Sequence, residues 1–132
     1  MQRLIFLFAV LLASSGCAKL AHMQQLLTLQ AYSREKDRQE EFITEHDSRF
    51  ARLMSVVRAG EMDHYLNREQ ILREFGQPVF KRVTNIGGIE AEEWFYREAT
   101  AYFEGDRVYF YFDRQGRVVD WEHKHLPPKQ QG

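Results

Sequence analysis

The strongest constraint on the fold is a long segment, residues 20–59, that contains no proline and no glycine. Gln, Leu, Glu, Arg and Lys dominate this segment, and these residue types favour a helix. The sequence therefore predicts one long helix, or two, ending at Gly60. Residues 33–41, in its middle, have no hydrophobic side chain. A kink, a frayed turn or a bridge exposed to water is expected there.

Apolar side chains recur at helical spacing on both sides of that polar middle. They are Leu20, Met23, Leu26, Leu27 and Tyr32 before it, and Phe42, Ile43, Phe50, Leu53, Met54 and Val57 after it. This spacing is typical of a helix that packs on a domain or tethers it. The alternative is a coiled coil through which the protein forms homo-oligomers, but fewer than three uninterrupted heptads are present.

A second, short helix is bounded by residues that favour the ends of helices. Asn67 is a good N-cap, and Gln70 three residues later completes a pattern resembling a capping box. Gly76 fits a C-terminal cap, and Pro78 prevents the helix from continuing.

After Pro78 the hydrophobic period changes to two, which is the period of a strand. Strands are expected at residues 80–84, 91–97, 107–112 and 117–123, with turns at 85–88, 104–106 and 113–116. Such short turns allow antiparallel pairing only. The predicted fold class is therefore α+β, with one long and one short helix packed on an antiparallel meander of three to four strands. Val108, Phe110 and Phe112 should face the helices, and Tyr109 and Tyr111 should face away.

The first residues have the pattern of an export signal. Arg3 precedes an apolar run at residues 4–13, which is about half the length needed to cross a bilayer. Small residues then lead to Cys17, and this arrangement resembles the lipobox of bacterial lipoproteins. The resemblance implies that residues 1–16 are removed and that Cys17 carries a diacylglycerol and an N-acyl chain. Ala18 beside it favours the outer membrane. The alternative is an ordinary secretory peptide that leaves Cys17 as a spare thiol.

Three motifs occur in order in the rest of the chain. They are residues 66–78, which end in Gly76 and Pro78; residues 93–96, with Trp94 and Tyr96; and residues 108–118, with Phe112, Asp113 and Gly116. Together they resemble the SmpA/OmlA (BamE-like) family of small outer-membrane lipoproteins. The resemblance implies helices on a three-stranded sheet and, as partner, another envelope protein such as the β-barrel assembly machinery. The expected organisation is a signal peptide at 1–16, a lipid-anchored helical segment at 17–60, a BamE-like α+β module at 61–126 and a flexible tail at 127–132. The long helix departs from the short tether of the family.

Charge and motif content narrow the functional classes. The chain has 18 Lys and Arg against 19 Asp and Glu, a net charge of −1, which argues against a nucleic-acid binder. His123 and His125 would share a strand face, but a catalytic zinc needs a third protein ligand. The sequence has neither a nucleophile elbow nor a phosphate-binding glycine loop. We therefore expect a non-enzymatic adaptor with no cofactor beyond its lipid, which contacts its partner through Tyr109 and Tyr111. The alternatives are a self-associating helical spacer and a periplasmic metal-dependent hydrolase.

Overall fold

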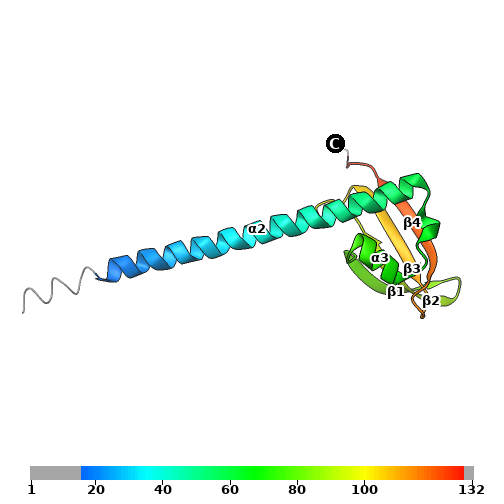
Figure 1. Cartoon of the computed structure of the whole chain (residues 1–132), viewed down its shortest axis with the longest axis horizontal. Coiled ribbons are helices and arrows are strands. Elements are labelled where there is room, and N and C mark those ends of the chain that lie inside the picture. Colours follow the sequence, from blue (N-terminus) through cyan, green and yellow to red (C-terminus); the bar gives the residue numbers. More distant parts are fainter. Residues whose placement is uncertain (1–15, 130–132) are drawn as a thin grey trace, which may run out of the picture. The chain divides into compact units, whose positions relative to one another are not determined.

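The computed structural model describes the backbone of residues 16–129 and the side chains of residues 23–129. The elements, in chain order, are helix α2 (Gly16–Ala59), the 3₁₀ helix η1 (Met62–His64), helix α3 (Arg68–Phe75) and strands β1 (Phe80–Ile86), β2 (Ile89–Tyr96), β3 (Gly105–Phe112) and β4 (Val118–Leu126) (Figure 1). The strands form one antiparallel sheet in the order β1-β2-β3-β4. The predicted α+β fold is therefore confirmed, and of the three to four strands expected in the meander the sheet has four.

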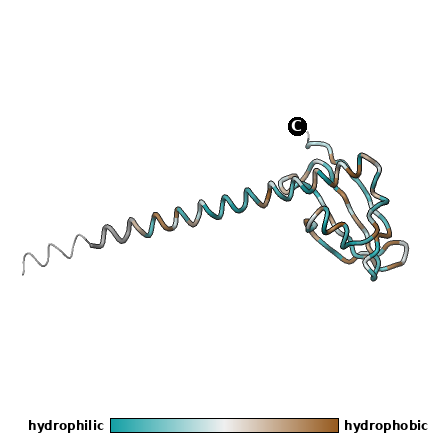
Figure 2. The backbone as a smooth tube through the Cα atoms, viewed as in Figure 1, coloured by the Kyte–Doolittle hydropathy of each residue, from teal (hydrophilic) through white to brown (hydrophobic). Residues whose placement is uncertain are grey.

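The chain divides into two units between Glu41 and Phe42, and helix α2 runs through this boundary. In the first unit every side chain from residue 23 to residue 41 is exposed. Of the expected alternatives, one continuous helix is found, and its hydrophilic middle is drawn mainly in teal in Figure 2. Ion pairs of Arg38 with Glu35 at 2.9 Å and of Lys36 with Glu40 at 3.7 Å lie along this exposed surface. Such pairs stabilise an isolated helix slightly.

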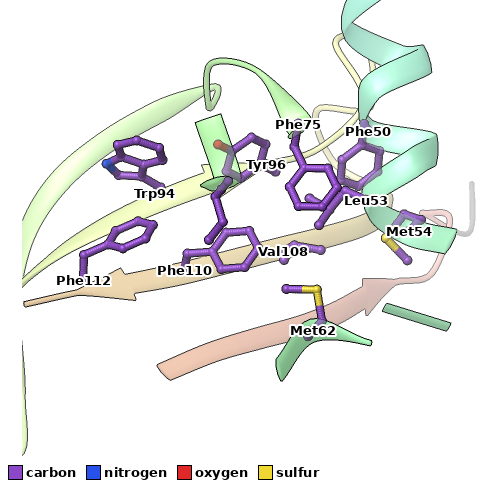
Figure 3. Close-up of a cluster of buried hydrophobic side chains, with 11 residues drawn as sticks. Phe50, Leu53, Met54, Met62, Phe75, Trp94, Tyr96, Val108, Phe110 and Phe112 are labelled. Carbon is purple, nitrogen blue, oxygen red and sulfur yellow. The ribbon is translucent and has the colours of Figure 1, made fainter. Parts of the chain in front are cut away.

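The second unit has one hydrophobic core, between the helices and one face of the sheet (Figure 3). Side chains from α2, η1 and α3 meet side chains from β2 and β3 there. They are Phe50, Leu53, Met54, Met62, Ile71 and Phe75 from the helices, and Trp94, Tyr96, Val108, Phe110 and Phe112 from the strands. The expectation that the helices cover the Val108, Phe110 and Phe112 face is confirmed.

Helix α3 has the expected caps. The side chain of Asn67 accepts a hydrogen bond from the Gln70 backbone N–H at 3.0 Å, while the Gln70 side chain accepts one from the Leu66 backbone N–H at 2.8 Å. At the other end the Gly76 N–H donates to the Leu72 carbonyl at 2.9 Å. The buried Tyr96 hydroxyl donates to the Gly76 carbonyl, also at 2.9 Å, and joins this helix end to the sheet. Pro78 lies half-buried between α3 and β1.

The turns differ from the expected boundaries. Strand β1 continues to Ile86, so that the predicted turn at residues 85–88 is reduced to Gly87 and Gly88. Both glycines have positive φ, 58° and 86°, which is what a tight two-residue hairpin requires. Gly105 belongs to strand β3 and not to the preceding turn, and β4 extends to Leu126. These corrections lengthen the paired part of the sheet.

Several predictions fall wholly or partly outside the described chain. The predicted signal peptide covers residues 1–16, of which 1–15 are not described. Cys17 lies in the first turn of α2, but its side chain is outside the described residues. Of the predicted tail, residues 127–129 have no regular secondary structure and residues 130–132 are not described. Over the described residues, no helix combines the length and the apolar character needed to span a membrane.

Candidate protein-binding face of the sheet

The sheet has a second face, which the helices of the second unit do not cover; we call it the open face. Side chains alternate between the two faces along a strand, and the register of the strands shows which of them are neighbours. The open face comprises Phe80, Arg82 and Thr84 of β1, Ala91, Glu93 and Phe95 of β2, Arg107, Tyr109 and Tyr111 of β3, and Asp120, Glu122 and Lys124 of β4. The predicted contact residues Tyr109 and Tyr111 are both here and both half-buried.

A row of aromatic rings crosses the open face. Phe80 pairs with Phe95, and Phe95 pairs with Tyr109 in the strand register. The ring centres of Phe80 and Phe95 are 5.6 Å apart in an edge-to-face arrangement, and those of Phe95 and Tyr109 are 4.9 Å apart and stacked. Phe95 is only 7% exposed because its neighbours on the same face cover it. These contacts add stability beyond the burial of area and hold the rings in fixed positions.

The next row of the open face is polar. Arg82 pairs with Glu93, and Glu93 pairs with Tyr111. The Arg82 guanidinium contacts the Glu93 carboxylate at 2.7 Å through Nε and at 3.0 Å through Nη2. The Tyr111 hydroxyl lies 3.4 Å from Glu122 Oε2, and burial together with the charges of Glu93 and Glu122 raises the pKa of Tyr111 to about 12. The Tyr111 hydroxyl therefore stays protonated at neutral pH and remains a hydrogen-bond donor.

Glu93 is buried although its side chain is charged. Adjacent acidic residues such as Glu92 and Glu93 are usually solvated surface, but Glu93 is only 3% exposed. Glu92 points to the opposite face, where it accepts hydrogen bonds from Arg68 at 2.7 Å and from the Trp94 indole. Each carboxylate can be buried, wholly or partly, because an arginine from another segment pairs with it.

The two histidines considered as metal ligands lie near one end of the helix-covered face. His123 Nε2 and His125 Nδ1 each donate to Asp106 Oδ1, at 2.9 and 3.1 Å. Arg58 at the end of α2 approaches Asp106 Oδ2 at 3.7 Å. Burial alone would raise the pKa of Asp106, but the hydrogen bonds and charges of the two imidazoles outweigh it, so that the pKa is lowered. Over residues 23–129, no group of three or more His, Cys, Asp or Glu side chains is arranged to hold a metal ion.

The remaining motif residues are structural. Trp94, Tyr96 and Phe112 belong to the core, and Asp113 and Gly116 form the β3–β4 hairpin. Asp113 accepts hydrogen bonds from the backbone N–H groups of Gln115 at 3.0 Å and Arg117 at 2.9 Å. The hydrogen bond from the Arg117 backbone is the main reason why the pKa of Asp113 is lowered. These contacts fix the hairpin and so the register of the two tyrosines.

Five aromatic or cationic residues of the open face were not predicted from the sequence, namely Phe80, Arg82, Phe95, Arg107 and Lys124. The available signal was the alternation that singled out Tyr109 and Tyr111. Along β3 the same alternation assigns Arg107 to this face, and the register across the short β3–β4 turn adds Lys124. Residues 97–104 separate β2 from β3, so only the pairing of these strands assigns Phe95, and with it Phe80 and Arg82, to this face.

Comparison with known proteins finds no family model, no curated protein and no solved structure that matches this chain.

Proposed function

We propose that this protein is a lipid-anchored, non-enzymatic adaptor of the bacterial envelope, whose α+β module binds another envelope protein through the open face of its sheet. The observation that carries the proposal is the row of Phe80, Phe95 and Tyr109, which lies on the face that the described helices of the second unit do not cover. Aromatic residues and arginine are enriched at protein interfaces and contribute most of the binding energy there.

The anchor and the site of action are inferred from the sequence around Cys17. Small residues precede this cysteine as in a lipobox, and acyl chains on it would hold the module at a membrane surface. Ala18 favours the outer membrane as the destination. The ordered motifs shared with the SmpA/OmlA family support the β-barrel assembly machinery as the partner, and so a role in outer-membrane protein assembly or envelope integrity.

Site-specific photo-crosslinking in intact cells tests the proposal. A crosslinking amino acid at position 109 or 111 should capture an envelope protein, identified by mass spectrometry. The matched control is position 69, because Glu69 is exposed on helix α3 and so lies away from the open face. Equal capture from position 69, or no captured protein from 109 and 111, would contradict the adaptor.

A second candidate function, a self-associating spacer, is favoured by the apolar side chains at the start of the described helix. Met23, Leu26, Leu27 and Leu29 are between 59% and 65% exposed. Isolated exposed apolar residues are common, but four within seven positions could pair with a second helix. Sedimentation of the full-length protein in detergent distinguishes the two functions. A protein that sediments as a single chain at every concentration would exclude the spacer function and leave the adaptor function as the proposal.

A further inference from the structure

Three cations gather at one end of the sheet, Arg107 and Lys124 on the open face and Arg97 directly after the end of β2. Arg107 pairs directly with Lys124 in the register of β3 and β4. Arg97 follows Tyr96, whose partner is Val108, so the same register brings Arg97 next to Arg107. Both arginines also contact Tyr102, Arg97 at 4.5 Å from its ring centre and Arg107 through a 2.7 Å hydrogen bond to its carbonyl. We call Arg97, Arg107 and Lys124 the cation row.

The cation row is poorly neutralised. Within residues 23–129 neither arginine of the row forms an ion pair, and Lys124 has one, to Glu122 at 3.3 Å. Arg97 donates instead to the carbonyls of Glu98 at 2.7 Å and Ala99 at 2.8 Å, which leaves its charge uncompensated. Like charges directly opposite each other on neighbouring strands destabilise a sheet. The sheet is therefore destabilised by repulsion between Arg107 and Lys124, at a surface that also has exposed aromatic rings.

Aromatic rings alternate with these cations. Arg107 lies 5.7 Å from the ring centre of Phe95, and Lys124 lies 5.2 Å from that of Tyr109. The β2–β3 loop adds Tyr102 and Phe103, which are 61% and 72% exposed. Contact with the rings holds the long cationic side chains in place, so that less entropy is lost when an anion binds them.

We infer that the cation row and the adjoining rings bind an acidic segment of the partner protein; the inference rests on the adaptor proposed above. The strands of a sheet lie about 4.8 Å apart, and this spacing separates the backbone positions from which neighbouring cations of the row project. Acidic residues three or four positions apart on one face of a helix have Cβ atoms about 5–6 Å apart, a similar spacing of attachment points. Charge complementarity of this kind selects the partner and its orientation.

A protein segment fits this surface better than an anionic membrane. Glu104 is exposed in the β2–β3 loop beside the row, and Asp120 and Glu122 are exposed on the same face. A uniformly negative bilayer would meet these carboxylates together with the cations and would be repelled by them. A segment with a few spaced carboxylates can contact the row and avoid them.

Fluorescence anisotropy of a labelled oligoglutamate peptide tests the inference, using the full-length protein in a nonionic detergent. We expect saturable binding that weakens with added salt, and no binding of an oligoglutamine peptide. The double variant Arg107→Gln/Lys124→Gln should bind at least about tenfold more weakly. Lys124→Gln alone should weaken binding about threefold. Because the Lys124 side chain is exposed, this single variant should fold normally, so it tests the inference even if the double variant fails to fold. The control Arg34→Gln/Lys36→Gln removes the same charge from exposed positions of α2 and should leave binding unchanged.

Three outcomes of the binding measurements would overturn the inference. They are absence of oligoglutamate binding, equal weakening in the two double variants, and binding of phosphatidylglycerol micelles in place of the peptide. Crosslinking from position 109 tests the proposed adaptor function independently of the acidic segment. If Arg107→Gln/Lys124→Gln leaves that crosslink intact, the adaptor stands and the acidic segment is excluded.

Discussion

At the scale of single residues, Gly116 shows how closely the β3–β4 hairpin approaches helix α3. Its φ is +79°, and a Cβ atom there would lie 2.9 Å from Arg68 Nε. Its carbonyl accepts the Arg68 backbone N–H at 2.9 Å. We expect Gly116→Ala to lower the free energy of unfolding by about 1–3 kcal/mol, through both strain and the displaced arginine. Urea denaturation followed by tryptophan fluorescence measures it.

Gly87→Ala is the matched control for this substitution. Gly87 also has positive φ, +58°, but nothing lies within 4 Å of its Cβ position. It therefore incurs the backbone cost without the contact. A loss of stability in Gly116→Ala no larger than that in Gly87→Ala would show that the approach to Arg68 is unimportant.

The burial of Glu93, again a property of a single residue, could not be predicted from the sequence. Its charge predicts exposure, and its neighbour Glu92 is acidic as well. Burial depends on Arg82, which is eleven residues away and becomes a cross-strand partner only when β1 and β2 pair in one particular register. The short Gly87-Gly88 turn sets that register, and the turn predicted at residues 85–88 is two residues longer.

At the scale of elements, Asp106 joins β3 to β4 and to the end of α2 through His123, His125 and Arg58. Because the pKa of Asp106 is lowered on folding, its carboxylate stabilises the protein at pH values above the ordinary value of 3.8. This stability should be lost as the pH falls through the lower pKa of the folded state. Asp106→Asn should be less stable than the wild type at neutral pH and should lack this part of the acid dependence. Urea midpoints measured against pH test it.

The control is Asp120→Asn, since the Asp120 side chain accepts a hydrogen bond from the Trp121 backbone N–H and is not part of the Asp106 cluster. It should follow the acid dependence of the wild type. An Asp106→Asn curve parallel to the wild-type curve at every pH would refute the role of the cluster.

Helix α2 is one element with two environments. Leu53 is fully buried in the core, whereas Leu26 is 63% exposed. We expect Leu53→Ala to cost about 2–5 kcal/mol of stability, because a buried leucine leaves a cavity. Leu26→Ala should change the stability by less than about 0.5 kcal/mol, as surface substitutions do. Chemical denaturation of both variants provides the comparison, and a large loss in Leu26→Ala would show that the first unit also contributes to folding.

At the scale of the whole molecule, the sequence predicted the order of the elements and the two faces of β3 better than it predicted the site. The change of the hydrophobic period after Pro78 predicted the sheet, and the absence of proline and glycine from residues 20–59 predicted helix α2. Alternation along β3 assigned Tyr109 and Tyr111 to one face, because this information is local. The cation row instead combines residues of three segments, and only the pairing of β2, β3 and β4 brings Arg97, Arg107 and Lys124 together.

The proposed membrane anchor is a property of the whole molecule that should be separable from its fold. We expect wild-type protein in the membrane fraction, with a mass increase from acyl chains, because each buried methylene contributes about 0.8 kcal/mol to membrane binding. Cys17→Ser should be released from the membrane yet keep its thermal midpoint, since the core begins at Phe50. Ser48→Ala, on an exposed part of α2, is the control and should stay at the membrane. An unmodified thiol at position 17, or membrane retention of Cys17→Ser, would refute the anchor, and the adaptor would then lose its means of being held at the envelope.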